Sequence, residues 1–129
     1  MKKISVLFLI FVTVLAFSQN PTDSLLNILE SVKDTSRVRV LKELCWTTRY
    51  SNPPEALKYG HEALSLLKQI HMYQEETELN NFVGIIQRNI GDNATALEHF
   101  FSAQRLAERH GFDREFRTSG TRQNQYMVR

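Results

Sequence analysis

Residues 84–103, GIIQRNIGDNATALEHFFSA, allow two interpretations that lead to different functions. Gly84 and Gly91 stand seven positions apart ahead of a helix-like run, as glycines do in a phosphate-binding loop or at the turn of a helical repeat. A phosphate-binding loop requires the pattern G-x-x-x-x-G-K-[ST] after a strand. Here the glycine spacing is wrong, no lysine follows Gly91, and the residues before Gly84 have a helical pattern. The stretch therefore does not predict nucleotide binding.

Outward from this stretch, apolar residues recur at spacings of three and four, which is the period of an α-helix. We expect helices at about residues 21–32, 36–50, 53–70, 73–90 and 94–110. No stretch alternates apolar and polar residues as a strand does, so the sequence predicts an all-α fold. Ile90 and Leu97 belong to the apolar faces of the last two helices, and we expect both side chains to point inward.

The residues between these helices carry start and stop signals. Gly91 and Gly111 suit the left-handed conformation that ends a helix. Pro53 suits the first position of its helix, where a missing N–H group is tolerated. Short polar side chains that can serve as N-caps precede four of the helices. These candidate caps are Thr22 or Asp23, the run Asp34 to Ser36, Asn52, and Asp92 or Asn93.

The chain also resembles itself when it is shifted by 40 residues. The matching residues are Ala56 and Leu57 with Ala96 and Leu97, Ala63 with Ala103, and Leu66 with Leu106. Small residues thus recur seven positions apart in the second helix of each copy. Such spacing lets two helix backbones approach closely while larger residues fill the seam between them.

This repeat resembles the tetratricopeptide repeat family. The second copy carries the match, through Gly84, the Gly91-Asp92 turn, Ala96, Phe100 and Ala103. The first copy keeps the two alanines, but Gly60 stands where an aromatic residue is usual. Cys45 takes the place of the first glycine if one residue is missing from the turn at Ser51-Asn52-Pro53. The resemblance implies a short right-handed α-solenoid of antiparallel helix hairpins.

The repeat length leaves a second fold open. Forty residues exceed the usual ~34 of tetratricopeptide repeats and fall near the ~40–47 of HEAT repeats. A HEAT-like array is therefore the alternative. The Gly91-Asp92 turn and the paired alanines favour a tetratricopeptide variety with lengthened helices.

The predicted organisation has five segments. They are a signal peptide at 1–18, a short leading helix at 19–35, repeat 1 at 36–72, repeat 2 at 73–112, and a partial or degenerate third repeat at 113–129. Lys2 and Lys3, followed by an apolar run to Phe17 and small residues at Ala16 and Ser18, form the three-part layout of a secretory signal. We therefore expect an exported protein, periplasmic or secreted; an uncleaved N-terminal anchor is the alternative.

The charge balance gives no support for nucleic-acid binding. Removal of Lys2 and Lys3 with the signal leaves 14 of the 16 basic residues, equal in number to the 14 acidic ones. Cys45 is the only cysteine, so no internal disulfide can form, and its apolar neighbours predict a buried core residue.

The sequence offers no constellation for catalysis or metal binding. A zinc-protease helix would need a second histidine where Ser65 follows His61-Glu62. The four histidines, at 61, 71, 99 and 110, have no tight ligand spacing, and no nucleophile is paired with a base. We expect neither an enzyme, nor a cofactor, nor a metal site.

The family resemblance implies a binding face instead. In tetratricopeptide proteins the first helices of successive hairpins line a concave groove that binds peptides or protein segments. By motif position, this groove takes Arg39, Lys42, Trp46, Arg49 and Tyr50 from repeat 1, and Glu78, Asn81, Ile85, Arg88 and Asn89 from repeat 2. Tryptophan, tyrosine and arginine dominate binding hot spots. The hypothesis is a groove for an extended acidic or C-terminal peptide; the alternative is that Trp46 simply packs on the short leading helix.

The end of the chain bears on partners and on function. Residues 117–129 keep almost no apolar face. Either they form a polar capping segment, or the gene is truncated or frameshifted within a third repeat of a longer parent. We expect the apolar edge of the last hairpin to promote self-association. The layout also looks like the exported N-terminal part of bacterial signalling proteins, so the alternative function is the truncated sensory region of a histidine kinase or transcription regulator.

Overall fold

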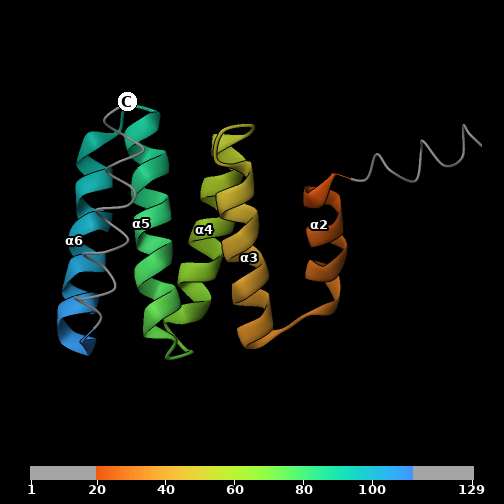
Figure 1. The fold of residues 1–129 in the computed structure, drawn as a ribbon, viewed down its shortest axis with the longest axis horizontal. Coiled ribbons are helices and arrows are strands. Elements are labelled where there is room, and N and C mark those ends of the chain that lie inside the picture. The colour runs from red at the N-terminus through yellow and green to blue at the C-terminus, as the bar shows by residue number, and fades with distance from the viewer. Residues whose placement is uncertain (1–19, 112–129) are drawn as a thin grey trace, which may run out of the picture.

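Five α-helices follow one another along residues 20–111, the part of the chain that the computed structural model describes (Figure 1). They are α2 (Pro21–Ser31), α3 (Asp34–Thr48), α4 (Pro53–Leu67), α5 (Tyr73–Asn89) and α6 (Asn93–His110). These residues contain no strand, which confirms the all-α prediction. The predicted signal peptide and third repeat lie outside the described residues.

The caps of α4 and α6 repeat the same chemistry 40 positions apart. Asn52 Oδ1 accepts a hydrogen bond from the Glu55 N–H at 3.3 Å, and Asp92 Oδ1 accepts one from the Thr95 N–H at 3.2 Å. Both predicted caps are confirmed, with Asp92 rather than Asn93 serving α6. The 40-residue repeat of the sequence is therefore also a repeat of local structure.

The turn between α5 and α6 closes through the backbone. Gly91 has a left-handed φ of 93°, and its N–H donates to the Arg88 carbonyl at 3.0 Å. The Asp92 N–H donates to the Gln87 carbonyl at 2.9 Å, which completes a Schellman motif. Gly111 ends α6 in the same left-handed region, with a φ of 77°. Both predicted glycine stops are confirmed.

Two predicted caps were wrong. Asn20, not Thr22 or Asp23, caps α2, because Pro21 is the first residue of the helix and the residue before it is therefore the cap. No side chain caps α3, which begins at Asp34, earlier than expected, with a φ of 53° at that residue. An aspartate tolerates this left-handed geometry better than most residues.

The helices stand side by side in a row along the long axis of the molecule (Figure 1). α3 packs on α4 and α5 on α6, so that each pair forms a hairpin, and contacts of α5 with both α4 and α3 join the two hairpins. Apolar side chains with at most 2% of their surface exposed form the core between them. They are Val38, Leu41, Leu44, Cys45, Ala56, Ala63, Leu67, Leu79, Val83, Ile86, Ala96, Ala103 and Ala107.

Arg37 holds the short helix α2 against the first hairpin. Its Nη1 donates to the Leu29 carbonyl of α2 at 3.0 Å, while Nε and Nη2 both contact Glu62 Oε1 of α4, at 3.1 and 2.6 Å. One guanidinium therefore links three helices. The half-buried Leu25, Leu26 and Leu29 add apolar contacts with the core.

Each hairpin contains one glycine at a position where no side chain fits. A Cβ added at Gly84 of α5 would lie 2.7 to 3.0 Å from three ring carbons of Phe100 of α6. A Cβ added at Gly60 of α4 would lie 2.7 Å from Val83 Cγ2 and 3.1 Å from Cys45 Sγ. In the sequence alignment Cys45 corresponds to Gly84, and Gly60 to Phe100. The glycine of the close contact thus lies on the first helix of the second hairpin but on the second helix of the first hairpin. Val83 of α5 fills the space beside Gly60 in the first hairpin.

Two residues expected inside are exposed. Ile90 is 51% exposed because it lies beyond the last turn of α5, in the connection to α6. Leu97 is 53% exposed because it lies about 100° around α6 from the buried Ala96. Phe101, one turn after Leu97, is 55% exposed as well. The inward prediction for Ile90 and Leu97 was therefore wrong.

The seam at Gly84 predicts an unusual response to alanine. In a helix interior, Gly→Ala normally stabilises by up to about 1 kcal/mol. Here the added methyl group collides with the Phe100 ring, and overpacking of this kind costs about 1–3 kcal/mol. We expect Gly84→Ala to lower the free energy of unfolding, measured by urea denaturation.

The double variant Gly84→Ala, Phe100→Leu provides the control, because the smaller side chain leaves room for the new methyl group. Relative to Phe100→Leu alone, it should lose little or no stability. A Gly84→Ala protein more stable than wild type would contradict the tight seam, since helix propensity alone would then decide the outcome.

Candidate functional site

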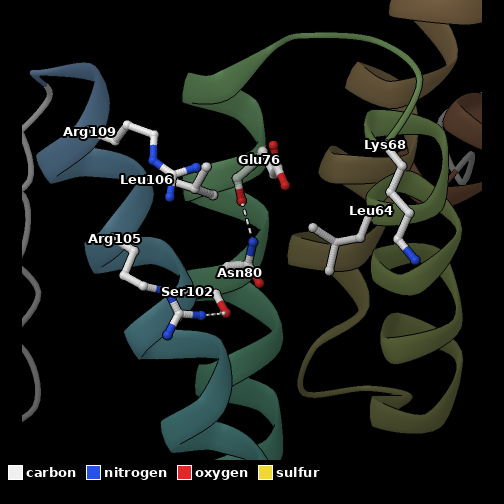
Figure 2. A pocket seen from close by; sticks show the side chains of 8 residues that line it. All are labelled: Leu64, Lys68, Glu76, Asn80, Ser102, Arg105, Leu106 and Arg109. Carbon is white, nitrogen blue, oxygen red and sulfur yellow. Dashed lines mark hydrogen bonds between the residues drawn. The ribbon is translucent and has the colours of Figure 1, made fainter.

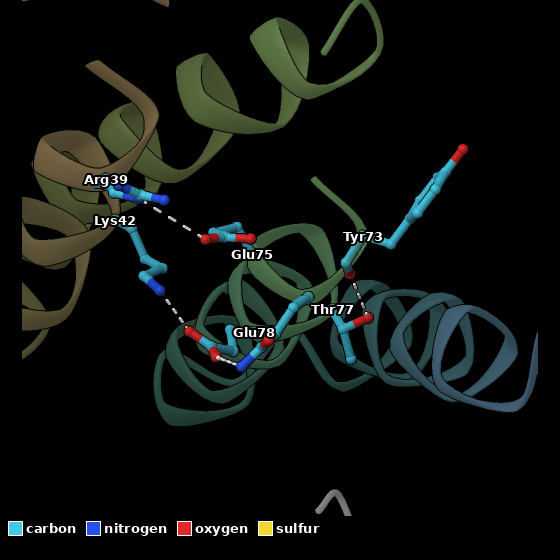
Figure 3. A network of polar contacts seen from close by, with 7 residues as sticks. Arg39, Lys42, Tyr73, Glu75, Thr77 and Glu78 are labelled. Carbon is cyan, nitrogen blue, oxygen red and sulfur yellow. Dashed lines mark hydrogen bonds and ion pairs between the residues drawn. The ribbon is translucent and has the colours of Figure 1, made fainter. Parts of the chain in front are cut away.

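The face implied by the family resemblance lies along α3 and α5, which contact each other. Lys42 Nζ forms an ion pair with Glu78 Oε2, and Arg39 Nε lies 3.8 Å from Glu75 Oε1 (Figure 3). Gln74 Nε2 donates to the second oxygen of Glu78 at 3.3 Å. The structure therefore pairs two predicted residues, Lys42 and Glu78, with each other, and pairs the predicted Arg39 with Glu75, which was not predicted for this face. The charges of Arg39, Lys42 and Glu78 are compensated within the chain.

Trp46 lies at the centre of a cluster at the carboxyl-terminal end of α3. Its ring stacks on Phe82 of α5, with centroids 4.4 Å apart and planes inclined by 29°. The Arg49 guanidinium lies 3.8 Å from the centroid of the Trp46 ring and 4.4 Å from that of Tyr50. We call Trp46, Arg49, Tyr50 and Phe82 the aromatic cluster. Phe82 was not among the residues that the sequence predicted for this face, and its place beside Trp46 depends on the contact between α3 and α5.

Arg49 is held by rings and by a backbone carbonyl rather than by a carboxylate. Its Nη1 donates to the Trp46 carbonyl, and it forms no ion pair within residues 20–111. Its Nε is the buried side-chain polar atom in this part of the chain that lacks a hydrogen-bond partner. A buried unsatisfied donor is unfavourable by about 1–3 kcal/mol. Tyr50 beside it is 70% exposed and Arg49 itself is half-buried, so the cluster presents an exposed ring next to a cation that has no carboxylate partner among the described residues.

The remaining predicted residues lie on α5 and in different environments. Asn81 is half-buried, while Arg88 and Asn89 are exposed. Ile85 is only 4% exposed and so offers almost no surface to a partner. Its helical position placed it on this face, but burial of an aliphatic side chain is favourable and the side chain is covered. We therefore leave Ile85 out of the proposed contact set.

A cleft of about 330 Å³ opens on another side of α5, between α4 and α6 (Figure 2). It is lined by Leu64, Lys68, Glu76, Asn80, Ser102, Arg105, Leu106 and Arg109. Glu76 and Glu78 are two residues apart and so point about 200° apart around α5. The cleft is therefore separate from the α3–α5 face. No sequence prediction included it, because its lining residues come from three helices and share no motif.

A polar network lies behind this cleft. Asn80 Nδ2 donates to the Glu76 carbonyl at 2.9 Å, which leaves Asn80 Oδ1 as the acceptor from His99 Nδ1, also at 2.9 Å. His99 Nδ1 therefore carries a proton. The ring of His61 lies 5.8 Å from that of His99. Burial, and then the nearby His61, lower the pKa of His99, while the weaker influence of Glu98 raises it.

Cys45 has the environment of a structural residue rather than of a nucleophile. It is fully buried, and burial raises the pKa of its thiol to about 12, although a backbone hydrogen bond involving Gly60 acts in the opposite direction. The thiolate is the reactive form of cysteine, and this environment disfavours it at neutral pH. Within residues 20–111, no three histidine, cysteine or acidic side chains gather in a way that could hold a metal ion.

Lowered proton affinity at His99 predicts a loss of stability in acid. The unfolded chain takes up this proton near pH 6.5, whereas the folded chain does so only at lower pH. Stability from neutral His99 is therefore complete above about pH 6.5 and is lost as the pH falls towards the folded pKa. The urea concentration at the midpoint of unfolding should decrease when the pH is lowered from 7 to 5. This decrease should be smaller in His99→Gln.

His71→Gln is the matched control, because it removes a histidine outside the Asn80–His99 network, and it should retain the pH dependence of the wild type. Equal losses of stability in wild type and His99→Gln would show that another group takes up the proton.

The described helices include none with the length and apolar character needed to cross a membrane. Comparison of the chain with protein-family models, with curated proteins and with solved structures finds no match. The function must therefore be argued from the geometry of the two surfaces.

Proposed function

We propose that the chain is an exported protein–protein interaction module of the tetratricopeptide type, a short right-handed α-solenoid that binds a protein or peptide segment on the α3–α5 face. The recurrence of equivalent structural features about 40 residues apart supports the assignment to tetratricopeptide repeats. Asn52 and Asp92 cap equivalent helices. The Cys45–Gly60 and Gly84–Phe100 positions form equivalent seams.

The observation that carries the binding proposal is the state of Arg49. Arg39 and Lys42 are compensated by acidic residues of α5, but Arg49 has neither a carboxylate partner within residues 20–111 nor a hydrogen bond at Nε. It lies against Trp46 and the exposed Tyr50. A guanidinium between aromatic rings combines the residue types that dominate interface energetics.

This arrangement narrows the chemistry of the partner. The partner carboxylate, from an acidic side chain or a chain terminus, approaches Arg49, while an apolar or aromatic group packs on the exposed ring of Tyr50. The ion pairs of Arg39 and Lys42, which lie nearer the start of α3, fix the position of α5 against α3 but add no net attraction for a partner. Recognition is therefore concentrated at the aromatic cluster instead of being spread along the groove.

The test begins with capture of a partner by the immobilised mature chain and its identification by mass spectrometry. Binding of that partner should weaken by about tenfold or more in Tyr50→Ala and in Arg49→Lys. Arg49→Lys keeps the charge but loses the planar fork that stacks on the rings. Isothermal titration calorimetry measures both effects.

Lys58→Ala serves as control, because Lys58 lies on α4 and its only ion pair in the described residues is with the neighbouring Glu55. Unchanged affinity in Tyr50→Ala and Arg49→Lys, with correct folding by circular dichroism, would remove the aromatic cluster from the binding site.

The exposed edge of α6 supports a second role, self-association. Leu97 and Phe101 are one turn apart on this helix and are both more than half exposed. Of their counterparts 40 residues earlier, Leu57 is half-buried and packs against the core, whereas His61 is exposed, although its ring lies 5.8 Å from that of His99 in the next hairpin. Leu97 and Phe101 thus form an apolar exposed edge where the first hairpin has a half-buried leucine and a polar ring, and a second copy of the chain is the proposed occupant of this edge.

Analytical ultracentrifugation tests this role. The wild type should show a sedimentation coefficient that rises with protein concentration, and the double variant Leu97→Ser, Phe101→Ser should sediment as a monomer at every concentration. Lys58→Ser, on α4, is the surface control. A wild-type protein that remains monomeric and melts cooperatively would contradict the proposal.

A further inference from the structure

The cleft between α4 and α6 carries more positive charge than the chain neutralises. Lys68, Arg105 and Arg109 line it together with a single carboxylate, Glu76. Within residues 20–111, none of the three cations forms an ion pair, not even with Glu76. This contrasts with the α3–α5 face, where Arg39 and Lys42 each meet a glutamate.

The helix dipole accounts for only part of this charge. Cations are favourable near the carboxyl-terminal ends of helices, where Lys68 follows α4 and Arg109 lies in the last turn of α6. Arg105 lies one turn earlier than Arg109 and gains little from the dipole, whose influence is confined to the last turn. Its guanidinium is instead held by the Ser102 hydroxyl, with Nη2 3.1 Å from Oγ (Figure 2).

The cleft has an apolar component between its charges. Leu64 of α4 and Leu106 of α6 are both half-buried and line the two walls. Lys68 lies on the same wall as Leu64, and the two arginines lie on the wall of Leu106 (Figure 2). Asn80 is engaged with groups of the chain itself, because its Nδ2 donates to the Glu76 carbonyl and its Oδ1 accepts from His99 Nδ1. A complementary ligand therefore has anionic groups on two sides and aliphatic groups between them.

We propose that this cleft binds an acidic segment of a partner protein, in which one carboxylate meets Lys68 and a second meets Arg105 and Arg109. The aliphatic stems of the acidic side chains and an intervening apolar residue pack on Leu64 and Leu106. Two carboxylates that replace the missing counter-ions also reduce the repulsion among the three cations. This site is separate from the aromatic cluster and goes beyond the binding function proposed for the α3–α5 face.

The probe is a synthetic peptide with the sequence Gly-Glu-Leu-Glu-Gly, acetylated and amidated so that its side chains carry the only charges. Binding to the full chain is measured at low ionic strength by calorimetry or by amide chemical shifts. Lys68→Gln and Arg105→Gln should each weaken binding by about two- to fivefold, as expected for exposed ion pairs. Glu76→Gln should strengthen it by a similar factor, because it removes the one opposing charge.

Three comparisons make the result specific. Lys58→Gln removes the same charge from α4 outside the cleft, and Tyr50→Ala alters the other face, so neither should change the affinity for the peptide beyond a small general effect. The matching Gly-Gln-Leu-Gln-Gly peptide should not bind. Salt at about 1 M, where the screening length falls to about 3 Å, should abolish binding.

Several outcomes would overturn the proposal. Equal binding of the glutamine peptide would remove the charge argument, and equal losses in Lys58→Gln and Arg105→Gln would show non-specific attraction. Adipate or inorganic phosphate binding as tightly as the peptide would assign the cleft to small anions instead of a protein segment. Weaker binding in Glu76→Gln would mean that this carboxylate positions the cations.

Discussion

The structure depends on close approach between helices at two glycine positions, Gly84 of α5 and Gly60 of α4. Phe100 of α6 lies against Gly84, and Val83, the preceding residue of α5, reaches into the space beside Gly60 of α4. Adjacent residues of a helix point about 100° apart, so Val83 and Gly84 face different neighbours. One contact closes the second hairpin, and the other attaches it to the first. Because cores are close-packed, an extra methyl group at either glycine would force a side chain of a neighbouring helix to shift.

The position of α5 also decides how charge is distributed between the two surfaces. Its first turns carry three glutamates that point in different directions. Glu75 and Glu78 turn towards α3 and neutralise Arg39 and Lys42, while Glu76 turns alone into the cleft among three cations. Glutamates near the start of a helix interact favourably with the helix dipole whichever way the helix is rotated about its axis. The rotation of α5, set by its seams, is what makes one face balanced and leaves the other basic.

Much of the fold could be predicted from the sequence because its signals are local. Helical periodicity, the caps at Asn52 and Asp92 and the left-handed Gly91 each depend on a few neighbouring residues. The inward prediction failed for Leu97 because periodicity shows which residues share a face but not which faces another helix covers. Lys42 pairs with Glu78, and Ile85 is buried, because segments that are distant in sequence contact each other. The sequence therefore predicted which positions lie on the candidate face, but not which of their charges are neutralised or which side chains are covered.

The difference between the two surfaces follows from where counter-ions are found. At Arg39 and Lys42 of the α3–α5 face a partner carboxylate gains little, since breaking their ion pairs would offset the new ones. In the proposal for this face, affinity comes from a single cation, Arg49, together with desolvation of the rings around it, and the contribution of the rings responds weakly to salt. In the cleft, Lys68, Arg105 and Arg109 lose no internal ion pair when a carboxylate arrives, so attraction is long-ranged and screened by salt. The two proposals thus assign a short-range contact surface and an electrostatic surface to different sides of one small helical array.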